Sequence, residues 1–280
     1  MTTKIIHLTD PHLVTPGEPL YGLDPLARLR LALAEVERAH GDAALVLITG
    51  DLTNRGEVAA YRGLRDALAG LGVPWRLMMG NHDRRDAFLE VFPDAPRTAE
   101  GFVQFVVDTD DALVVGLDSL EPGTDAGGLC PRRLAWLRET LAANPGRDVL
   151  VAVHHPPLAV GMPVMDGIGL VEGAEELARL LLGHGRVRHL LMGHVHRPIA
   201  GSWRGIPFTA GRSSGHQCSL GLTAATFHGI HEPPALGVVL VDGGQVVVHA
   251  HDFLAGAPRF RFDDARAVRA RTPAELPPFA

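Results

Sequence analysis

Residues 43–51 read Ala-Ala-Leu-Val-Leu-Ile-Thr-Gly-Asp, a short apolar run that ends in a glycine and a carboxylate. Such a run is typical of a buried strand. Residues 5–9 and 75–79 show the same pattern, and helical periodicity fills the intervals at residues 25–40 and 58–71. This alternation of strand and helix predicts an α/β fold in which helices cover a sheet of parallel strands.

The remainder of the chain continues the mixed pattern without an internal repeat or a clear linker. We predict one domain over residues 1–256, followed by an extension rich in Arg, Pro and Ala at residues 257–280 that is loosely held. The further predicted elements are a hairpin (102–107 and 112–116), helices (132–143 and 172–182) and strands (148–153, 188–192, 206–209, 237–241 and 245–250).

Composition excludes several kinds of protein. The 280 residues include 2 Cys and 15 His, so a metal site must rest on His, Asp, Glu or Asn rather than on thiolates. Lys4 is the single lysine, which excludes a P-loop or a Schiff base unless Lys4 provides it. A net charge of −6 argues against binding to nucleic acid polymers. No signal peptide or membrane segment is recognisable, and we expect a soluble cytoplasmic protein without membrane partners.

Polar residues follow five of the predicted strands at the point where each strand ends. In α/β sheets, sites form at the carboxyl ends of strands. Any one of these short motifs is more often part of a surface loop, but agreement of all five at the same topological position is far less frequent by chance. The motifs are Asp10-Pro11-His12, Gly50-Asp51, Gly80-Asn81-His82-Asp83, His154-His155 and Gly193-His194-Val195-His196.

These motifs supply enough ligands for two metal ions if Asp51 bridges them. Imidazole and carboxylate without thiolate suit Fe, Mn, Zn or Co, as divalent or trivalent ions. Glycines at positions 50, 80 and 193 are expected to let the backbone turn sharply. The seven candidate ligands are Asp10, His12, Asp51, Asn81, His155, His194 and His196.

The ordered set of motifs resembles that of the calcineurin-like metallophosphoesterases, over residues 5–196. Further matches are similar to the branch with bacterial class III cyclic-nucleotide phosphodiesterases and glycerophosphodiesterases: Tyr21-Gly22, Leu52-Thr53, Pro156-Pro157-Leu158, Met165-Asp166 and His216-Gln217. The resemblance implies a four-layer sandwich of two packed mixed sheets flanked by helices.

The resemblance also implies how the ligands divide between the two ions. The first metal takes Asp10, His12, Asp51 and His196. The second takes Asp51, Asn81, His155 and His194. The choice of His155 rests on the resemblance alone, since the residues themselves do not distinguish it from His154.

The implied reaction is hydrolysis of a small phosphodiester, such as 3′,5′-cAMP or a glycerophosphodiester, by a metal-bound hydroxide. His82 is the candidate catalytic residue, as proton donor or as a contact to the phosphoryl oxygens. His216 is a candidate substrate contact, and Asp83 is expected to orient a neighbouring imidazole. His154 is expected either to contact the substrate as well or to have only a packing role in the fold. The loops at residues 156–171 and 211–232 are expected to set specificity, and a homo-oligomer is left open.

Other functions remain as alternatives. Gly211-Arg212-Ser213-Ser214-Gly215 fits the nucleophile elbow of serine hydrolases, with Asp242 and His249 or His251 in the right order. An elbow leads into a helix, however, and residues 217–226 show no helical pattern. On the metallophosphoesterase fold itself, the alternatives are a phosphomonoesterase, a nucleotide or lipid-linked pyrophosphatase, a nuclease, or a scaffold without catalytic activity.

Overall fold

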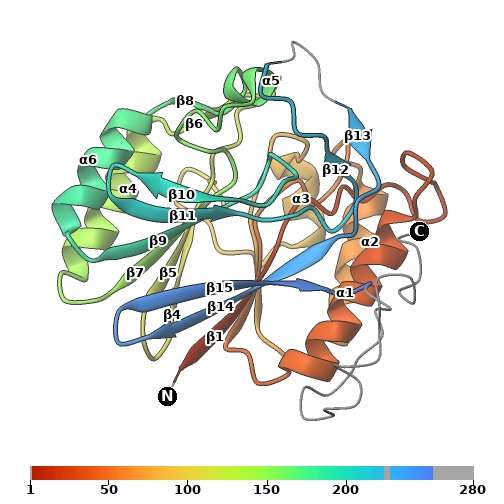
Figure 1. Ribbon diagram of the computed structural model, residues 1–280, viewed down its shortest axis with the longest axis horizontal. Helices are drawn as coiled ribbons and strands as arrows, with labels where there is room; N and C mark the ends of the chain where they lie inside the picture. Colours follow the sequence, from red (N-terminus) through yellow and green to blue (C-terminus); the bar gives the residue numbers. More distant parts are fainter. Residues whose placement is uncertain (1, 224–227, 255–280) are drawn as a thin grey trace, which may run out of the picture.

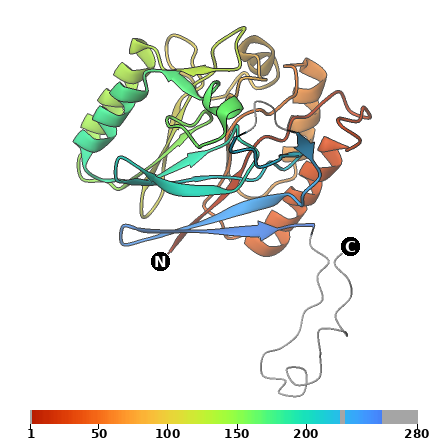
Figure 2. The ribbon, with the colours of Figure 1, turned by 45° about the horizontal axis from the view of Figure 1, so that its top comes forward.

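Two mixed β-sheets lie face to face, and helices cover the outer face of each (Figures 1 and 2). The computed structural model describes residues 2–223 and 228–254, so the predicted extension at residues 257–280 lies outside the described residues. The order of layers is helix, sheet, sheet, helix. The predicted four-layer α/β sandwich is confirmed.

The first sheet has five strands in the order β15-β14-β1-β2-β3. The strands β1, β2 and β3 are parallel, as the alternation of strands and helices predicted, while β14 and β15 run antiparallel to their neighbours. Their bounds are β1 (Thr3–Leu8), β2 (Leu45–Ile48), β3 (Trp75–Leu77), β14 (Ala235–Asp242) and β15 (Gln245–Asp252).

The second sheet has six strands in the order β10-β11-β9-β7-β5-β4. The central strands β5, β7, β9 and β11 are parallel, and β4 pairs with β5 as the predicted hairpin. Strand β10 was not predicted. Their bounds are β4 (Phe105–Asp108), β5 (Leu113–Leu117), β7 (Val149–Val153), β9 (Val187–Met192), β10 (Ile199–Trp203) and β11 (Ile206–Ala210).

Four of the helices in the described residues lie close to the predicted positions, at residues 25–40, 58–71, 132–143 and 172–182, whereas the short helices at residues 85–91 and 163–166 were not predicted. Helix α1 starts at Pro25, and the Asp24 carboxylate caps it by accepting a hydrogen bond of 2.9 Å from Ala27 N. The helices are α1 (Pro25–His40), α2 (Val58–Leu68), α3 (Arg85–Val91), α4 (Pro131–Ala143), α5 (Pro163–Asp166) and α6 (Ala174–His184). Two small pairs complete the fold: β6 (Gly127–Gly128) with β8 (Leu170–Glu172), and β12 (Gln217–Cys218) with β13 (Gly229–Ile230).

Three apolar clusters hold the layers together. One lies between the first sheet and α1, α2 and α3, and another between the second sheet and α4 and α6. The third lies between the two sheets, where Ile5 and Leu47 of one sheet meet Val114 and Leu150 of the other. Strands β2 and β7 are buried along their whole length and are apolar throughout, which is why the sequence predicted them well.

The segment that resembles a nucleophile elbow has another structure. Ser213 is fully buried, and its hydroxyl donates to the backbone carbonyl of Asp10 at 2.6 Å. The segment leads into strand β12 rather than into a helix. Ser213 therefore supports the loop after β1 and is not an exposed nucleophile.

Among the described residues, no helix is long and apolar enough to cross a membrane.

Candidate metal centre

Four predicted ligands meet at the carboxyl ends of three strands. Asp10 and His12 follow β1, Asp51 follows β2, and His196 follows β9. All four are buried, and one ligand atom from each lies within 4.8 Å of the others. His12 Nε2 lies 2.9 Å from His196 Nε2 and 3.4 Å from Asp51 Oδ2, while His196 Nε2 lies 3.3 Å from Asp10 Oδ1.

These separations fit ligands of one metal ion. Two ligand atoms that each lie about 2.1 Å from a tetrahedral ion are roughly 3.4 Å apart, and they come closer at higher coordination numbers. The 2.9 Å between His12 Nε2 and His196 Nε2 is unfavourable in a buried cluster unless a proton or a cation lies between the two nitrogens, because their lone pairs repel each other. The donor set, two imidazoles and two carboxylates, suits the transition metals expected from the sequence.

A second group of donors lies on the other side of Asp51. The Asn81 side-chain oxygen lies 3.0 Å from His194 Nδ1 and 3.3 Å from His154 Nε2. His154 Nε2 is also 3.4 Å from Asp51 Oδ2. Asp51 therefore contacts a histidine of each group, His12 in the first and His154 in the second, which is the arrangement of a bridging carboxylate.

The pair His154-His155 is divided by its contacts. His154 Nδ1 lies 2.7 Å from the Thr49 carbonyl, so an Nδ1–H donated to that carbonyl leaves the Nε2 lone pair directed to Asp51 and Asn81. His155 also belongs to a possible ligand group, since one ring nitrogen from each of His154, His155 and His194 lies within 4.8 Å of the others, and His155 Nδ1 is 2.7 Å from the Ser119 hydroxyl. Among the described residues, no carboxylate oxygen pairs with His155, whereas His154 reaches two carboxylates.

The backbone at the ligands is strained. Asp10, His12, Asp51, His194 and His196 all have φ between 46° and 70°. This left-handed region is uncommon for residues with a side chain, and it costs on the order of 1 kcal/mol for each residue. Five such residues at the ends of β1, β2 and β9 indicate that the fold holds these side chains in position at the expense of local stability, which is characteristic of functional sites.

The three glycines predicted to permit sharp turns act in two different ways. Gly50 has a φ of +100°, as expected for a turn that only glycine adopts readily. Gly80 and Gly193 do not have a positive φ, and close packing explains them instead. A Cβ on Gly80 would collide with the Asp51 carboxylate and backbone, and a Cβ on Gly193 would collide with the Thr9 hydroxyl and the Asp10 carboxylate.

Hydrogen bonds from the backbone hold the two aspartates in place. The His194 amide donates to both oxygens of Asp10 at 3.1 Å, and the Thr9 hydroxyl donates to Asp10 Oδ2 at 2.5 Å. The His82 amide donates to Asp51 Oδ1 at 2.9 Å. Asp10 Oδ1 and Asp51 Oδ2 are the carboxylate oxygens that lie nearest to the imidazole nitrogens.

Asp83 has a structural role that differs from the expected one. It accepts hydrogen bonds from the amides of Leu52, Thr53 and Gly80 and from the Tyr61 hydroxyl. It therefore joins the loop after β2 to the loop after β3. Burial and the neighbouring Asp51 raise the pKa of Asp83 to about 6.

The charges in the cluster depend on one another. Burial opposes ionisation of Asp51, but the His154 and His12 rings outweigh it and hold the pKa of Asp51 well below its usual value. Burial also disfavours a charged His154, yet Asp51 and Asp10 raise its pKa to about 9. Burial and His154 lower the pKa of His194 to about 3. The buried carboxylates thus require positive charge close by, which metal ions provide.

His82 and His216 lie at the cavity above the two groups of ligands, which has a volume of about 200 Å³. The His82 ring is edge-on to the His12 ring at 4.6 Å between centroids, and its Nδ1 lies 2.9 Å from the Asn54 carbonyl. The His216 ring lies 4.7 Å from the His196 ring, and burial together with His196 lowers its pKa to about 4. The structure thus brings both candidate substrate contacts to the metal centre.

Sequence reasoning assigned no role to other residues at this cavity. Tyr21, quoted only as part of the resemblance, lies with its ring 4.8 Å from the His216 ring and is 65% exposed. Asp125 lines the cavity, and Ser119 contacts His155. Tyr21 carries one detectable signal, since it directly precedes a glycine in the loop after the first ligand motif, whereas Ser119 and Asp125 belong to no recognisable motif.

Comparison with known sequences gives one consistent result. The sequence model for the calcineurin-like phosphoesterase family matches residues 3–198. A probable cyclic nucleotide phosphodiesterase of Rhodopseudomonas palustris is 43% identical over 269 residues, which cover 95% of this chain and 98% of the relative. A probable glycerophosphodiester phosphodiesterase of Arcobacter nitrofigilis is 31% identical over 235 residues, which cover 83% of this chain and 86% of that protein.

Solved structures share the fold. A dimetal phosphatase from Danio rerio superimposes with a TM-score of 0.67 at 15% identity, covering 90% of this chain and 96% of the other. A purple acid phosphatase from yellow lupin gives a TM-score of 0.62 at 14% identity, covering 92% of this chain and 52% of the other. At these identities the similarity establishes the fold and leaves the substrate open.

Proposed function

This chain belongs to the calcineurin-like phosphoesterase family, and we propose that it is a two-metal phosphodiesterase that hydrolyses small phosphodiesters. The observation that carries the proposal is the position of Asp51, whose Oδ2 lies 3.4 Å from an imidazole nitrogen of each ligand group. The names of its relatives make cyclic nucleotides and glycerophosphodiesters the first candidate substrates.

We assign the ligands by their contacts. The first ion would be held by Asp10, His12, Asp51 and His196, as the resemblance implied. For the second ion, the contacts favour Asp51, Asn81 and His194 together with His154, where the resemblance had implied His155. That His155 is a metal ligand stays a prediction. Measuring the metal content of the variants His154→Ala and His155→Ala can decide between the two histidines.

Two ions in these positions, when bound, polarise a phosphate oxygen and lower the pKa of a coordinated water. The chain itself contributes the shape and charge around them. Its carboxylates are fixed by backbone amides, so that little reorganisation is needed when a substrate binds. We propose Fe, Mn, Zn or Co as the metals, because the donors are imidazole, carboxylate and amide oxygen.

His82 is placed to act on the bound phosphate. A hydrogen bond from Nδ1–H to the Asn54 carbonyl fixes the ring and leaves Nε2 available to a substrate in the cavity. We propose that His82 donates a proton to the leaving oxygen or stabilises charge on the phosphoryl oxygens. The His216 ring also lies near the His12 ring, at 5.2 Å between centroids, and His216 is proposed to contact the substrate.

A substrate panel tests this function. Metal-reconstituted protein is assayed with bis(p-nitrophenyl) phosphate, p-nitrophenyl phosphate, 3′,5′- and 2′,3′-cyclic AMP, and glycerophosphodiesters. We expect at least one natural diester to be hydrolysed with a higher kcat/KM than the monoester, and chelation to abolish turnover. Faster hydrolysis of the monoester than of every diester would instead identify a phosphomonoesterase.

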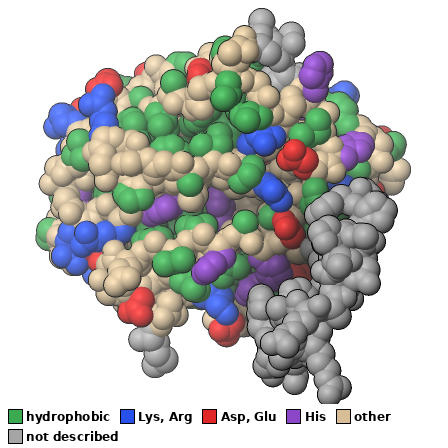
Figure 3. All heavy atoms as spheres, viewed as in Figure 1, with side chains coloured by type: hydrophobic (Ala, Val, Ile, Leu, Met, Phe, Trp, Pro, Cys, Tyr) green, Lys and Arg blue, Asp and Glu red, His purple; other side chains and the backbone are tan. Residues whose placement is uncertain are grey.

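The face shown in Figure 3 agrees with a small substrate. Lysine and arginine side chains of the described residues are scattered there among acidic and apolar side chains rather than gathered in one basic patch. A nucleic acid polymer is bound through a continuous basic surface. The net charge of −6 points the same way, and we propose small phosphodiesters, rather than nucleic acid polymers, as substrates.

A further inference from the structure

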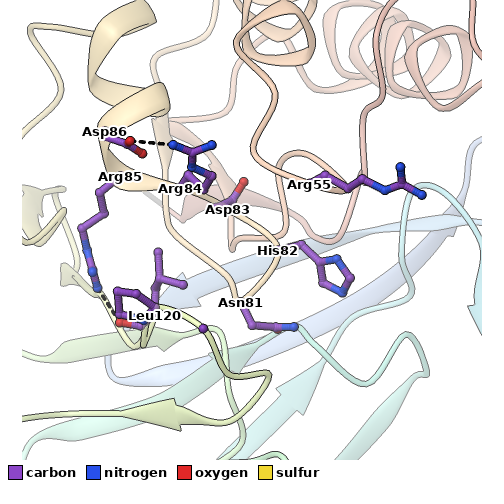
Figure 4. Close-up of a pocket in the computed structure, with 10 residues that line it drawn as sticks. Arg55, Asn81, His82, Asp83, Arg84, Arg85, Asp86 and Leu120 are labelled. Carbon is purple, nitrogen blue, oxygen red and sulfur yellow. Dashed lines mark hydrogen bonds and ion pairs between the residues drawn. The ribbon is translucent and has the colours of Figure 1, made fainter.

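A larger cavity of about 660 Å³ adjoins the metal centre (Figure 4). Asn81 and His82 line this cavity and also the smaller cavity over the metal ligands, so the two spaces meet at these residues. If the protein cleaves a phosphodiester at the metal centre, as proposed above, one of the two ester arms has room to extend past His82 into the larger cavity.

Three arginines line this larger cavity, and two of them are already paired. Arg84 Nη2 lies 2.7 Å from Asp86 Oδ2, and both nitrogens of the Arg85 fork lie 2.7 Å from the Asp118 carboxylate. The guanidinium of Arg55 has no ion-pair or hydrogen-bond partner within residues 2–223 and 228–254, although it is exposed. Arg55 therefore contributes the uncompensated positive charge at this cavity.

The loop that carries Arg55 is held firmly beside His82. The Asn54 carbonyl contacts His82 Nδ1 at 2.9 Å, and the Gly56 amide donates to the Thr53 hydroxyl at 2.9 Å. The Arg55 amide donates to the Glu57 carboxylate at 3.1 Å, but that carboxylate forms no ion pair with the guanidinium. Figure 4 shows the Arg55 and His82 side chains extending from neighbouring loops toward the same side.

Another cavity, which shares Tyr21, His216 and Cys218 with the cavity over the metal ligands, differs in charge. It is a cavity of about 290 Å³, where Tyr21, His216 and His231 contribute aromatic and imidazole rings. No arginine or carboxylate lines it among the described residues. The two arms of a bound diester thus meet different surroundings, and only the arm beside His82 meets a permanent positive charge.

We propose that Arg55 is a specificity residue that binds an anionic group on one ester arm of the substrate. The preferred substrates are then phosphodiesters with a second negative charge, a carboxylate or a phosphate, on the arm that passes His82. Diesters with a neutral arm remain substrates but bind less tightly, and a cationic arm is disfavoured.

Matched substrates test this inference. We compare p-nitrophenyl aryl phosphates whose second ring carries a 4-carboxylate, a 4-phosphonate or a neutral 4-carboxamide. At low ionic strength the carboxylate is expected to exceed the carboxamide in kcat/KM by about 5-fold, mainly through KM, which is typical of a charge-assisted contact at a partly exposed site. The phosphonate shows whether a phosphate-like group is preferred over a carboxylate.

Variants of Arg55 assign the preference to this residue. Arg55→Gln is expected to reduce the ratio of carboxylate to carboxamide to about 1, Arg55→Lys to keep part of it, and Arg55→Glu to invert it. Arg62→Ala is the matched control, because Arg62 is exposed on α2 and pairs with Glu90. For Arg62→Ala, the ratio of kcat/KM for the carboxylate to that for the carboxamide is expected to equal that of the unmodified protein. Thermal melts check that each variant is folded.

The outcomes separate this inference from the proposed function. If no diester is hydrolysed, the proposed function fails. If the charged and neutral diesters are hydrolysed equally well, the function stands and the role of Arg55 is refuted. A preference for the carboxylate that survives in Arg55→Gln would likewise refute it. In the unmodified protein, 0.5 M KCl should reduce the ratio, since screening weakens an exposed contact.

Discussion

The Nε2 atom of His154 lies 3.4 Å from Oδ2 of Asp51, whereas both nitrogens of the neighbouring His155 lie outside ion-pair distance of that carboxylate. This difference is the basis on which we propose His154, rather than His155, as a ligand of the second metal. The carbonyl of Thr49 completes the arrangement by fixing the His154 ring through Nδ1 at 2.7 Å.

Replacing each histidine of the pair in turn tests that assignment. His154→Ala is expected to weaken binding of one metal ion by at least 100-fold, because it removes a ligand that also contacts the shared Asp51. His155→Ala is the matched control and is expected to bind two ions with an affinity reduced less than 10-fold. Metal content after dialysis, measured by inductively coupled plasma mass spectrometry, distinguishes them. Loss of a metal in His155→Ala alone would reverse the assignment.

Gly80 is predicted to be essential because there is no room for a larger side chain beside Asp51. Gly80→Ala places a Cβ against the Asp51 carboxylate and backbone, so the bridging side chain must move. We expect loss of bound metal and a decrease of at least 100-fold in diester turnover. Gly70→Ala is the control, since nothing lies within 4 Å of its added Cβ and its φ is not positive. Normal metal binding by Gly80→Ala would show that the close approach is not required.

His82 is predicted to act in catalysis rather than in metal binding. His82→Ala keeps the backbone amide that bonds Asp51, so bound metal should be unchanged while kcat falls by about 100-fold. As a proton donor, His82 matters most for a poor leaving group. The loss should therefore be greater for a methyl ester than for a p-nitrophenyl ester, measured in the same assay. An equal loss for both esters would indicate that His82 only positions the phosphate.

His189 makes stability depend on pH. Burial lowers the pKa of His189 in β9 to about 4, against 6.5 in the unfolded chain. The unfolded state therefore binds more protons between these values, and stability is lost as the pH falls from about 6.5 toward 4. His189→Gln should regain about 2 to 3 kcal/mol relative to the unmodified protein between pH 7.5 and pH 4.5.

Urea unfolding of the two metal-free proteins measures this difference directly. The Gln side chain is able to keep a hydrogen bond to Thr209, whose hydroxyl lies 3.0 Å from His189 Nε2. Comparing the two proteins at each pH cancels the contributions of titrating groups that do not interact with His189; His7, whose pKa is lowered by the charge of His189 as well as by burial, is the exception. A difference in unfolding free energy that stays constant with pH would show that His189 is accessible to protons in the folded state.

The strands that carry the ligands could be predicted because each contains a short, mainly apolar run, and because a glycine, carboxylate or imidazole follows it. Strand β10 could not, since most of its five residues are exposed and it carries no such run. Helix α3 spans only Arg85–Val91 and directly follows a ligand loop, so its periodicity was too short to detect.

The details of the site depended on three-dimensional contacts. The sequence places His154 and His155 at the same strand end, and only the distances to Asp51 and Asn81 distinguish them. Arg55 has no motif of its own. Its proposed role in substrate specificity rests on the ion pairs of Arg84 and Arg85, which leave Arg55 as the arginine at the cavity without a carboxylate partner among the described residues.

The most direct test of a two-metal phosphodiesterase is a titration of metal-free protein with Mn²⁺, followed by turnover of bis(p-nitrophenyl) phosphate. Because Asp51 lies between two ligand groups, we predict that turnover rises until two equivalents of metal are bound and then stays constant. Full turnover without added metal, or saturation at a single equivalent, would contradict a centre in which two ions share Asp51.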